Sequence, residues 1–160
     1  MVSDTKQIET ALSVAVLRLL KWFNHLELNL GLSLSFLINE AAPKESYGAI
    51  SNMSLEKKLD KFIKLVEADE RLNTERVDLQ EWVDRTNRAR FVRNSFVHGS
   101  WEILPLRNNE PISLRLPPWI SEDKSEYSRR GLTIQNVEQA ADEMGQVFGQ
   151  FMHIRKLLGV

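Results

Sequence analysis

Apolar residues at helical spacing fill the N-terminal part of the chain. Between residues 5 and 42 they recur mostly at steps of three and four, at Ile8, Leu12, Ala15, Leu19, Trp22, Phe23 and Leu26. This spacing puts them on one face of an amphipathic helix, and such a face must be buried against other elements. Ser3 and Asp4 are candidate N-caps and Pro43 ends the segment. We therefore predict a long first helix.

The second half of this segment has a different pattern. Leucines alternate with polar or small residues from Leu26 to Phe36, which by itself is typical of a strand. However, no β-branched residue occurs between Leu26 and Leu37, and leucine favours helices. We expect the helix to continue at least to Leu34. Leucines at every second position of a helix face most sides of it, so we also expect burial against a second surface.

Three further helices are predicted. After a connector at residues 43–52, Ser51 or Ser54 begins a helix with Leu55, Leu59, Phe62 and Val66 buried and Lys57, Lys58, Lys61 and Lys64 facing water. A third helix covers roughly residues 77–98 and ends at Gly99. Thr133 begins the last helix, which carries Ile134, Val137, Ala141, Met144, Val147 or Phe148, Phe151, Ile154 and Leu158 at helical spacing. Its spacing places these side chains in the core.

Residues 99–132 differ in composition from the helices on either side. Four of the five prolines lie here, so no long helix is expected. The alternation of Ile112, Leu114 and Leu116 after the turn-like residues 107–110 indicates a short β-hairpin or an extended insertion. The expected fold is one mainly α domain over residues 1–160, a bundle of four to five helices with this insertion after the third.

Composition narrows the classes of function. The net charge is −1, the chain has no cysteine, and its longest uncharged apolar stretch, at residues 28–39, has 12 residues. We therefore expect a soluble, cytoplasmic protein without a membrane span, a disulfide or a thiolate metal site. No His or carboxylate cluster has metal-ligand spacing, and no glycine-rich phosphate loop occurs, so neither a metal nor a cofactor is predicted.

The third helix carries polar residues on a side away from its apolar arc. Trp82, Ala89, Val92 and Phe96 share that arc, whereas Asn94 and His98 fall on another side of the helix. The string Arg93-Asn94-Ser95-Phe96-Val97-His98 has the form R-N-x-x-x-H. It resembles the signature of the HEPN superfamily (higher eukaryotes and prokaryotes nucleotide-binding domains). With Gly99 and Trp101, it is similar to bacterial branches of a toxin or defence type.

The resemblance implies an α-helical bundle that dimerises, with the Arg and His motifs of two copies facing each other. In active members it implies metal-independent cleavage of RNA, and for toxin members an antitoxin-type protein partner. Toxin members paired with a minimal nucleotidyltransferase often carry a Tyr two residues after the His, as the target of modification. This chain has Ser100 there. Cleavage itself does not require that Tyr.

The residue types suit this chemistry. Cleaving RNA without metal needs a base for the 2′-hydroxyl, an acid for the leaving 5′-oxygen and cationic donors for the phosphate. Histidine supplies base or acid near neutral pH, which is the role expected for His98. Arg93 is expected to clamp the phosphate, and Asn94 to orient His98 or to bind the phosphate. Residues five apart on a helix differ by about 140°, so a second copy is needed to bring Arg and His together.

Other basic and aromatic residues near the motif are candidates for binding RNA. Arg85, Arg88, Arg90 and Arg93 lie within nine residues, and Trp101 follows the motif. We expect Arg88, Arg90 and Trp101 to contact RNA. Two alternatives stay open. His98 is a structural cap and Arg93 pairs with an acidic residue, or the chain is a non-catalytic HEPN-like homodimer that binds RNA, a nucleotide or a protein partner.

Overall fold

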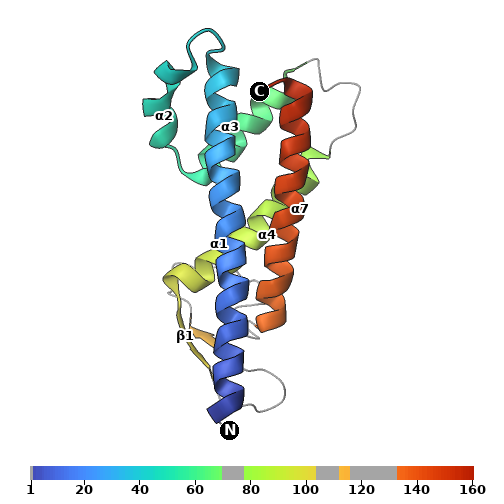
Figure 1. The fold of residues 1–160 in the computed structure, drawn as a ribbon. Helices are drawn as coiled ribbons and strands as arrows, with labels where there is room; N and C mark the ends of the chain where they lie inside the picture. Colours follow the sequence, from blue (N-terminus) through green and yellow to red (C-terminus); the bar gives the residue numbers. More distant parts are fainter. Residues whose placement is uncertain (1, 70–77, 104–111, 116–132) are drawn as a thin grey trace. The chain divides into compact units, whose positions relative to one another are not determined.

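The computed structural model describes residues 2–69, 78–103, 112–115 and 133–160. Its elements in chain order are α1 (Val2–Ile38), the short 3-10 helix η1 (Pro43–Ser46), α2 (Tyr47–Ser51), α3 (Leu55–Glu67), α4 (Leu79–His98), the strands β1 (Ser100–Ile103) and β2 (Ile112–Arg115), and α7 (Ile134–Leu158) (Figure 1). Most of the described residues are helical, which confirms the predicted mainly α class. Membership of the HEPN fold stays a prediction.

The first helix settles the ambiguity of the alternating leucines. α1 continues to Ile38, so the prediction of a helix reaching at least Leu34 is confirmed. Leu26, Leu30 and Leu34 are fully buried, whereas Leu28 is 62% and Phe36 is 41% exposed. Steps of four along a helix keep the same face inward, and the leucines between them point elsewhere. The helix therefore has one fully buried stripe, and the chain leaves Leu28 largely uncovered.

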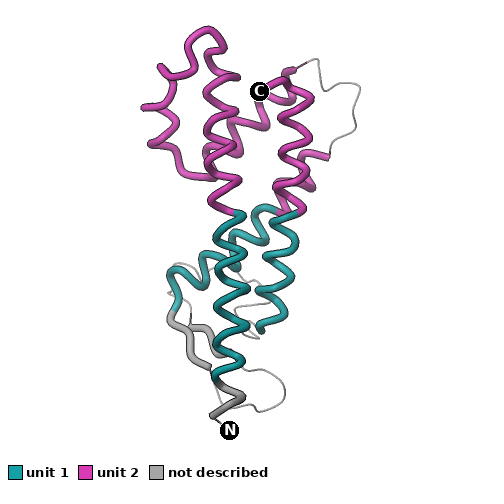
Figure 2. The backbone as a smooth tube through the Cα atoms, viewed as in Figure 1, with its two compact units in different colours: residues 1–22, 86–145 teal, residues 23–85, 146–160 magenta. Residues whose placement is uncertain are grey.

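The chain divides into two compact units (Figure 2). Unit 1 comprises residues 1–22 and 86–145, and unit 2 comprises residues 23–85 and 146–160. α1, α4 and α7 each contribute residues to both units. The single domain predicted for residues 1–160 stays a prediction.

Unit 1 has a small core built by three helices. Its fully or nearly fully buried side chains are Leu12, Ala15 and Leu19 of α1, Ala89, Val92 and Phe96 of α4, and Val137, Ala140, Ala141 and Met144 of α7. Apart from Ala140, these are positions that the helical periodicity predicted for the core. An exposed ion pair between Arg18 and Asp142 joins α1 to α7 on the surface of this unit.

Unit 2 has a larger core with an aromatic cluster at its centre. Trp82 of α4 is stacked on Phe151 of α7 at an interplanar angle of 19°, and both rings contact Phe62 of α3. The Trp82 indole Nε1–H donates a hydrogen bond of 3.0 Å to the backbone oxygen of Val147. This bond satisfies the polar group of a ring that is 98% buried, given a relative exposure of 2%. The aromatic cluster therefore ties α3, α4 and α7 together.

Two predictions about residues 43–64 need correction. The connector at 43–52 is largely helical, since η1 and α2 occupy it and bury Ile50. Of the two predicted cap candidates, Ser51 and Ser54, Ser54 is the N-cap of α3 and accepts a hydrogen bond from the Lys57 backbone N–H at 3.3 Å. Lys58, however, does not face water. Its ammonium donates to Glu27 of α1 at 2.9 Å, and burial of this lysine is possible because the carboxylate pairs with it.

The residues after α4 contain a small sheet. β1 and β2 pair antiparallel, with Trp101 opposite Leu114 and Ile103 opposite Ile112. Both strands fall within the predicted insertion at residues 99–132. The connecting residues 104–111 and the segment 116–132 lie outside the described residues, so the hairpin as a whole and the path of the insertion stay predictions.

The last helix begins with the predicted cap. The Thr133 backbone N–H donates to Asn136 Oδ1 at 2.9 Å, and the Asn136 backbone N–H donates to Thr133 Oγ1 at 3.1 Å. These reciprocal bonds satisfy backbone groups that the first turn of a helix leaves unpaired.

We expect Thr133→Ala to lower the free energy of unfolding by about 1 kcal/mol, because the substitution removes the side-chain acceptor of the cap. Urea denaturation followed by circular dichroism measures this change. Thr133→Ser keeps the hydroxyl and is the matched control. An unchanged unfolding midpoint for Thr133→Ala would contradict the cap assignment.

Candidate functional site

The R-N-x-x-x-H string occupies the C-terminal turns of α4, in unit 1. Its core side is held by Val92 and Phe96, which are 3% and 7% exposed, and by Ser95, which is fully buried. The Ser95 hydroxyl donates to the Phe91 backbone oxygen at 2.8 Å, and the Ser95 backbone oxygen accepts from Gly99 N–H at 2.9 Å. These contacts fix the end of the helix. Arg93, Asn94 and His98 occupy the remaining sides.

Arg93 is half-buried and is oriented by its neighbour. Its Nη1 donates a hydrogen bond of 2.8 Å to Asn94 Oδ1. Within the part of the chain that the structure describes, Arg93 forms no ion pair, and its buried Nε–H has no acceptor. The acidic partner considered as an alternative for Arg93 is therefore absent from the described residues. No carboxylate among the described residues pairs with the guanidinium, which retains donors for an anion.

Asn94 contacts Arg93 and not His98. Among the described residues, the hydrogen bond from Arg93 is the one that its side chain makes, and none joins it to His98. Of the two roles predicted for Asn94, orienting His98 is not what this geometry provides. A side-chain amide that fixes the guanidinium restricts the directions in which Arg93 can donate. Asn94 thus acts on the site through Arg93.

His98 is the last residue of α4 and is exposed. Within the described ranges its ring has no hydrogen-bond partner, and the neighbouring Val97 side chain is 47% exposed. Because five residues rotate the helix by about 140°, Arg93 and His98 of one chain project in different directions. A single chain presents a half-buried cation and an exposed imidazole on the same helix end, without joining them.

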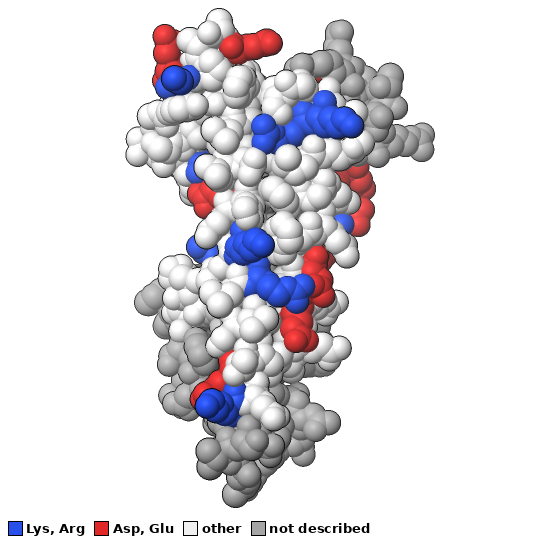
Figure 3. Space-filling view, in the orientation of Figure 1, with Lys and Arg blue, Asp and Glu red and all other residues white. Residues whose placement is uncertain are grey.

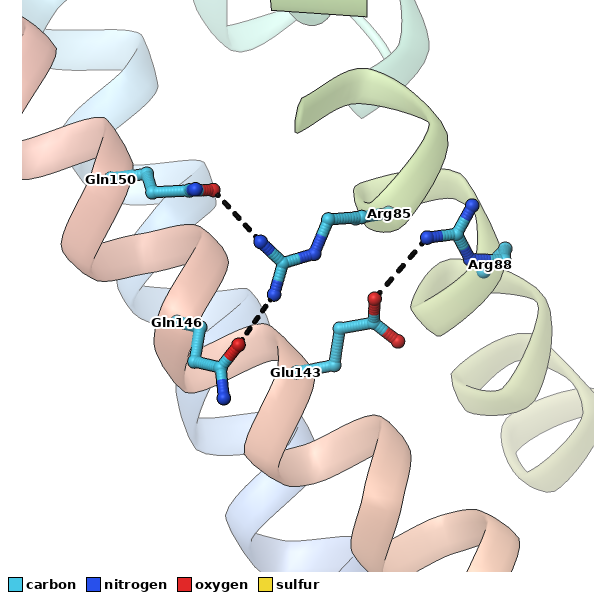
Figure 4. Close-up of polar contacts among 5 residues, drawn as sticks. All are labelled: Arg85, Arg88, Glu143, Gln146 and Gln150. Atoms are coloured by element: carbon cyan, nitrogen blue, oxygen red, sulfur yellow. Dashed lines mark hydrogen bonds and ion pairs between the residues drawn. The ribbon is translucent and has the colours of Figure 1, made fainter. Parts of the chain in front are cut away.

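The arginines that precede the motif are engaged with α7 (Figure 4). In unit 1, Arg88 Nη2 lies 3.3 Å from Glu143 Oε1. In unit 2, Arg85 donates to Gln146 at 2.6 Å and to Gln150 at 3.2 Å. Glu143, Gln146 and Gln150 were missed because nothing local in the sequence links them to α4.

Arg88, Arg90 and Trp101, the residues predicted to contact RNA, differ in their surroundings. Arg88 remains 59% exposed although it is paired with Glu143, and Arg90 is half-buried. Trp101 belongs to β1, directly after the motif. Further basic and aromatic residues of the insertion, Arg107, Trp119, Arg129 and Arg130, lie outside the described residues. The structure thus brings Arg90, Arg93, Asn94 and His98 onto the last turns of one helix.

Charge is mixed on the described surface. On the face drawn in Figure 3, each unit carries Lys and Arg side chains interspersed with Asp and Glu, and most of that face carries neither. An RNA-binding surface here would depend on a few local cations, as the net charge of −1 also indicates.

The described residues offer neither a metal site nor a membrane-spanning helix. No three His, Asp or Glu side chains among them lie close enough to hold a metal ion. In the same residues, no helix has an apolar stretch that would cross a bilayer. Comparisons with family models, with curated proteins and with solved structures found no match to this chain.

Proposed function

We propose that the chain is a metal-independent endoribonuclease of the HEPN type, a toxin or defence component that works as a homodimer. One observation carries the proposal. Arg93 is a half-buried arginine without an acidic partner among the described residues, held by Asn94, and it shares the end of α4 with the exposed His98. The Arg93 Nε–H is also buried without an acceptor among the described residues, whereas buried polar groups normally have a hydrogen-bond partner. An arginine with free donors and no carboxylate partner among the described residues is suited to bind a phosphate.

The reaction uses the 2′-hydroxyl of RNA as its nucleophile. Neutral His98 of one copy accepts the 2′-hydroxyl proton while the oxygen attacks phosphorus. The bond from phosphorus to the 5′-oxygen breaks, and the protonated His98 of the second copy donates its proton to that oxygen. Arg93 from each copy stabilises the charge that grows on the phosphate. The products are a 2′,3′-cyclic phosphate and a free 5′-hydroxyl.

Two copies are needed for geometric reasons. One chain separates Arg93 from His98 by about 140° around the helix axis, whereas a twofold axis beside the end of α4 would bring a second Arg93 and His98 to the same phosphate. Unit 1 also exposes apolar side chains. Val14 is 52%, Leu17 is 66% and Val97 is 47% exposed. Covering such residues against a second copy removes apolar surface from water.

One observation favours the non-catalytic alternative. No side chain in the described residues orients the His98 ring, whereas acid–base catalysis usually depends on a positioned imidazole. If no second copy supplies that contact, the same residues would bind RNA, a nucleotide or a protein partner without cleaving it.

We expect the purified full chain to cleave single-stranded RNA in EDTA and to leave 2′,3′-cyclic phosphate ends or their hydrolysed form. The measurement is gel analysis of end-labelled RNA with mass spectrometry of the products. The matched control substrate has hydrogen in place of the 2′-hydroxyl at the cleavage site. It should bind but stay intact, because the nucleophile is missing. Cleavage that requires magnesium, or cleavage of the control, would reject this mechanism.

A further inference from the structure

Unit 2 contains a groove that the proposed nuclease reaction does not use. It lies between α1 and the segment formed by α2 and α3, and Figure 1 shows α2 beside the C-terminal half of α1. Its volume is about 430 Å³, within the range of small-molecule sites. Leu28, Leu32, Tyr47 and Ile50 make its walls apolar. Leu28 and Tyr47 are 62% and 44% exposed, so the groove is open to solvent.

An ion pair between a buried lysine and a partly exposed glutamate lines one part of this groove. Lys58 Nζ lies 2.9 Å from Glu27 Oε1, and the two side chains are 9% and 44% exposed. Both residues line the groove. An ammonium group has three N–H donors. One of them reaches Glu27, and no described residue accepts the other two. The second oxygen of Glu27 likewise has no partner among the described residues.

Desolvation makes this arrangement costly unless a partner completes it. Lysine is rarely buried, and a buried charge needs hydrogen bonds as well as a counter-ion. A bound molecule could accept from Lys58 and donate to Glu27 at the same time. The charges of Lys58 and Glu27 cancel. At short range Glu27 would repel a ligand carboxylate, and Lys58 would repel a ligand ammonium. A neutral head group with adjacent acceptor and donor meets neither repulsion.

We propose that this groove binds a small neutral amphipathic amide. The amide C=O would accept from Lys58 and its N–H would donate to Glu27, while an apolar tail would lie along Leu28, Leu32 and Ile50. The site stands apart from the proposed nuclease chemistry, because it uses none of the α4 motif and lies wholly in unit 2. Failure of one proposal therefore leaves the other standing.

The test is an NMR titration of the ¹⁵N-labelled full chain with four probes that differ in head group or tail. Hexanamide should bind at least about tenfold more tightly than hexanoate or hexylammonium, since each charged head opposes one member of the ion pair. Butanamide should bind about sixteenfold more weakly than hexanamide, at about fourfold per CH₂ group removed. Tighter binding of hexanoate or hexylammonium, or binding by none of the four, would overturn the proposal.

Variants locate the site. Lys58→Met keeps the length of the side chain and removes its donors, so hexanamide binding should fall at least about tenfold. Lys64→Met, at an exposed position of the same helix, is the matched control and should bind as the unaltered chain does. Gly31→Leu gives an independent check, because a Cβ at Gly31 would lie 3.5 Å from Ile50 Cγ2, an ordinary contact. The Gly31→Leu protein should fold and should no longer bind hexanamide. Unchanged affinity in Lys58→Met or Gly31→Leu would refute the assignment.

Discussion

Arg93→Ala and His98→Ala are each expected to lower the rate of RNA cleavage by at least about a hundredfold. This is the scale associated with losing an acid–base group or a donor that stabilises the transition state. Arg93→Lys should recover little of the loss, because an ammonium does not reproduce the planar fork that contacts two phosphate oxygens. Asn94→Ala should cause a smaller loss, since it frees Arg93 from its 2.8 Å hydrogen bond without removing the charge.

Matched control variants distinguish a loss of catalysis from a loss of folding. Arg18→Ala removes an exposed arginine of unit 1 that pairs with Asp142, and His153→Ala removes an exposed histidine of α7. Both should cleave at the rate of the unaltered chain, since exposed ion pairs contribute little to stability. Circular dichroism and light scattering should show the same helix content and dimer for every variant. Cleavage that survives Arg93→Ala or His98→Ala would leave the binding protein as the better interpretation.

Trp82→Ala should lower the free energy of unfolding by about 3–5 kcal/mol, the range for removing a large aromatic side chain from a core. Trp82 is 2% exposed, is stacked on Phe151 and donates to the Val147 backbone oxygen. The substitution therefore leaves a cavity at the junction of α3, α4 and α7. Urea denaturation of the full chain, followed by far-ultraviolet circular dichroism, measures the change.

A second substitution at Trp82 separates the contribution of the hydrogen bond from that of the aromatic ring. Trp82→Phe keeps an aromatic ring and loses the 3.0 Å hydrogen bond, so it should cost less than Trp82→Ala. Met152→Ala, at a position of α7 that is 40% exposed, is the control and should change stability by less than about 0.5 kcal/mol. A Trp82→Ala protein as stable as the control would show that the aromatic cluster does not support unit 2.

The sequence by itself predicted the four long helices, but it extended the first to residue 42 instead of Ile38 and missed the helical segments at residues 43–51. Periodicity predicted the buried stripe of α1, and propensity decided correctly between helix and strand at Leu26 to Phe36. Thr133 was identified as a cap, and Ser54 as one of two candidates, because capping involves residues only three positions apart. The arc of Ala89, Val92 and Phe96 is buried as predicted. Each of these features depends on neighbours along the chain, so a local pattern contains the information.

Only the tertiary structure decided which side chains meet across elements. Lys58 pairs with Glu27, 31 positions away, and Arg88 with Glu143, 55 positions away. A helical pattern shows which face of α3 is polar, but it does not show which helix packs beside that face. The burial of Lys58, and the lack of an acidic partner for Arg93 in the described residues, follow from that packing. Side-chain pairing between distant segments depends on how the helices are brought together, and no local pattern records that arrangement.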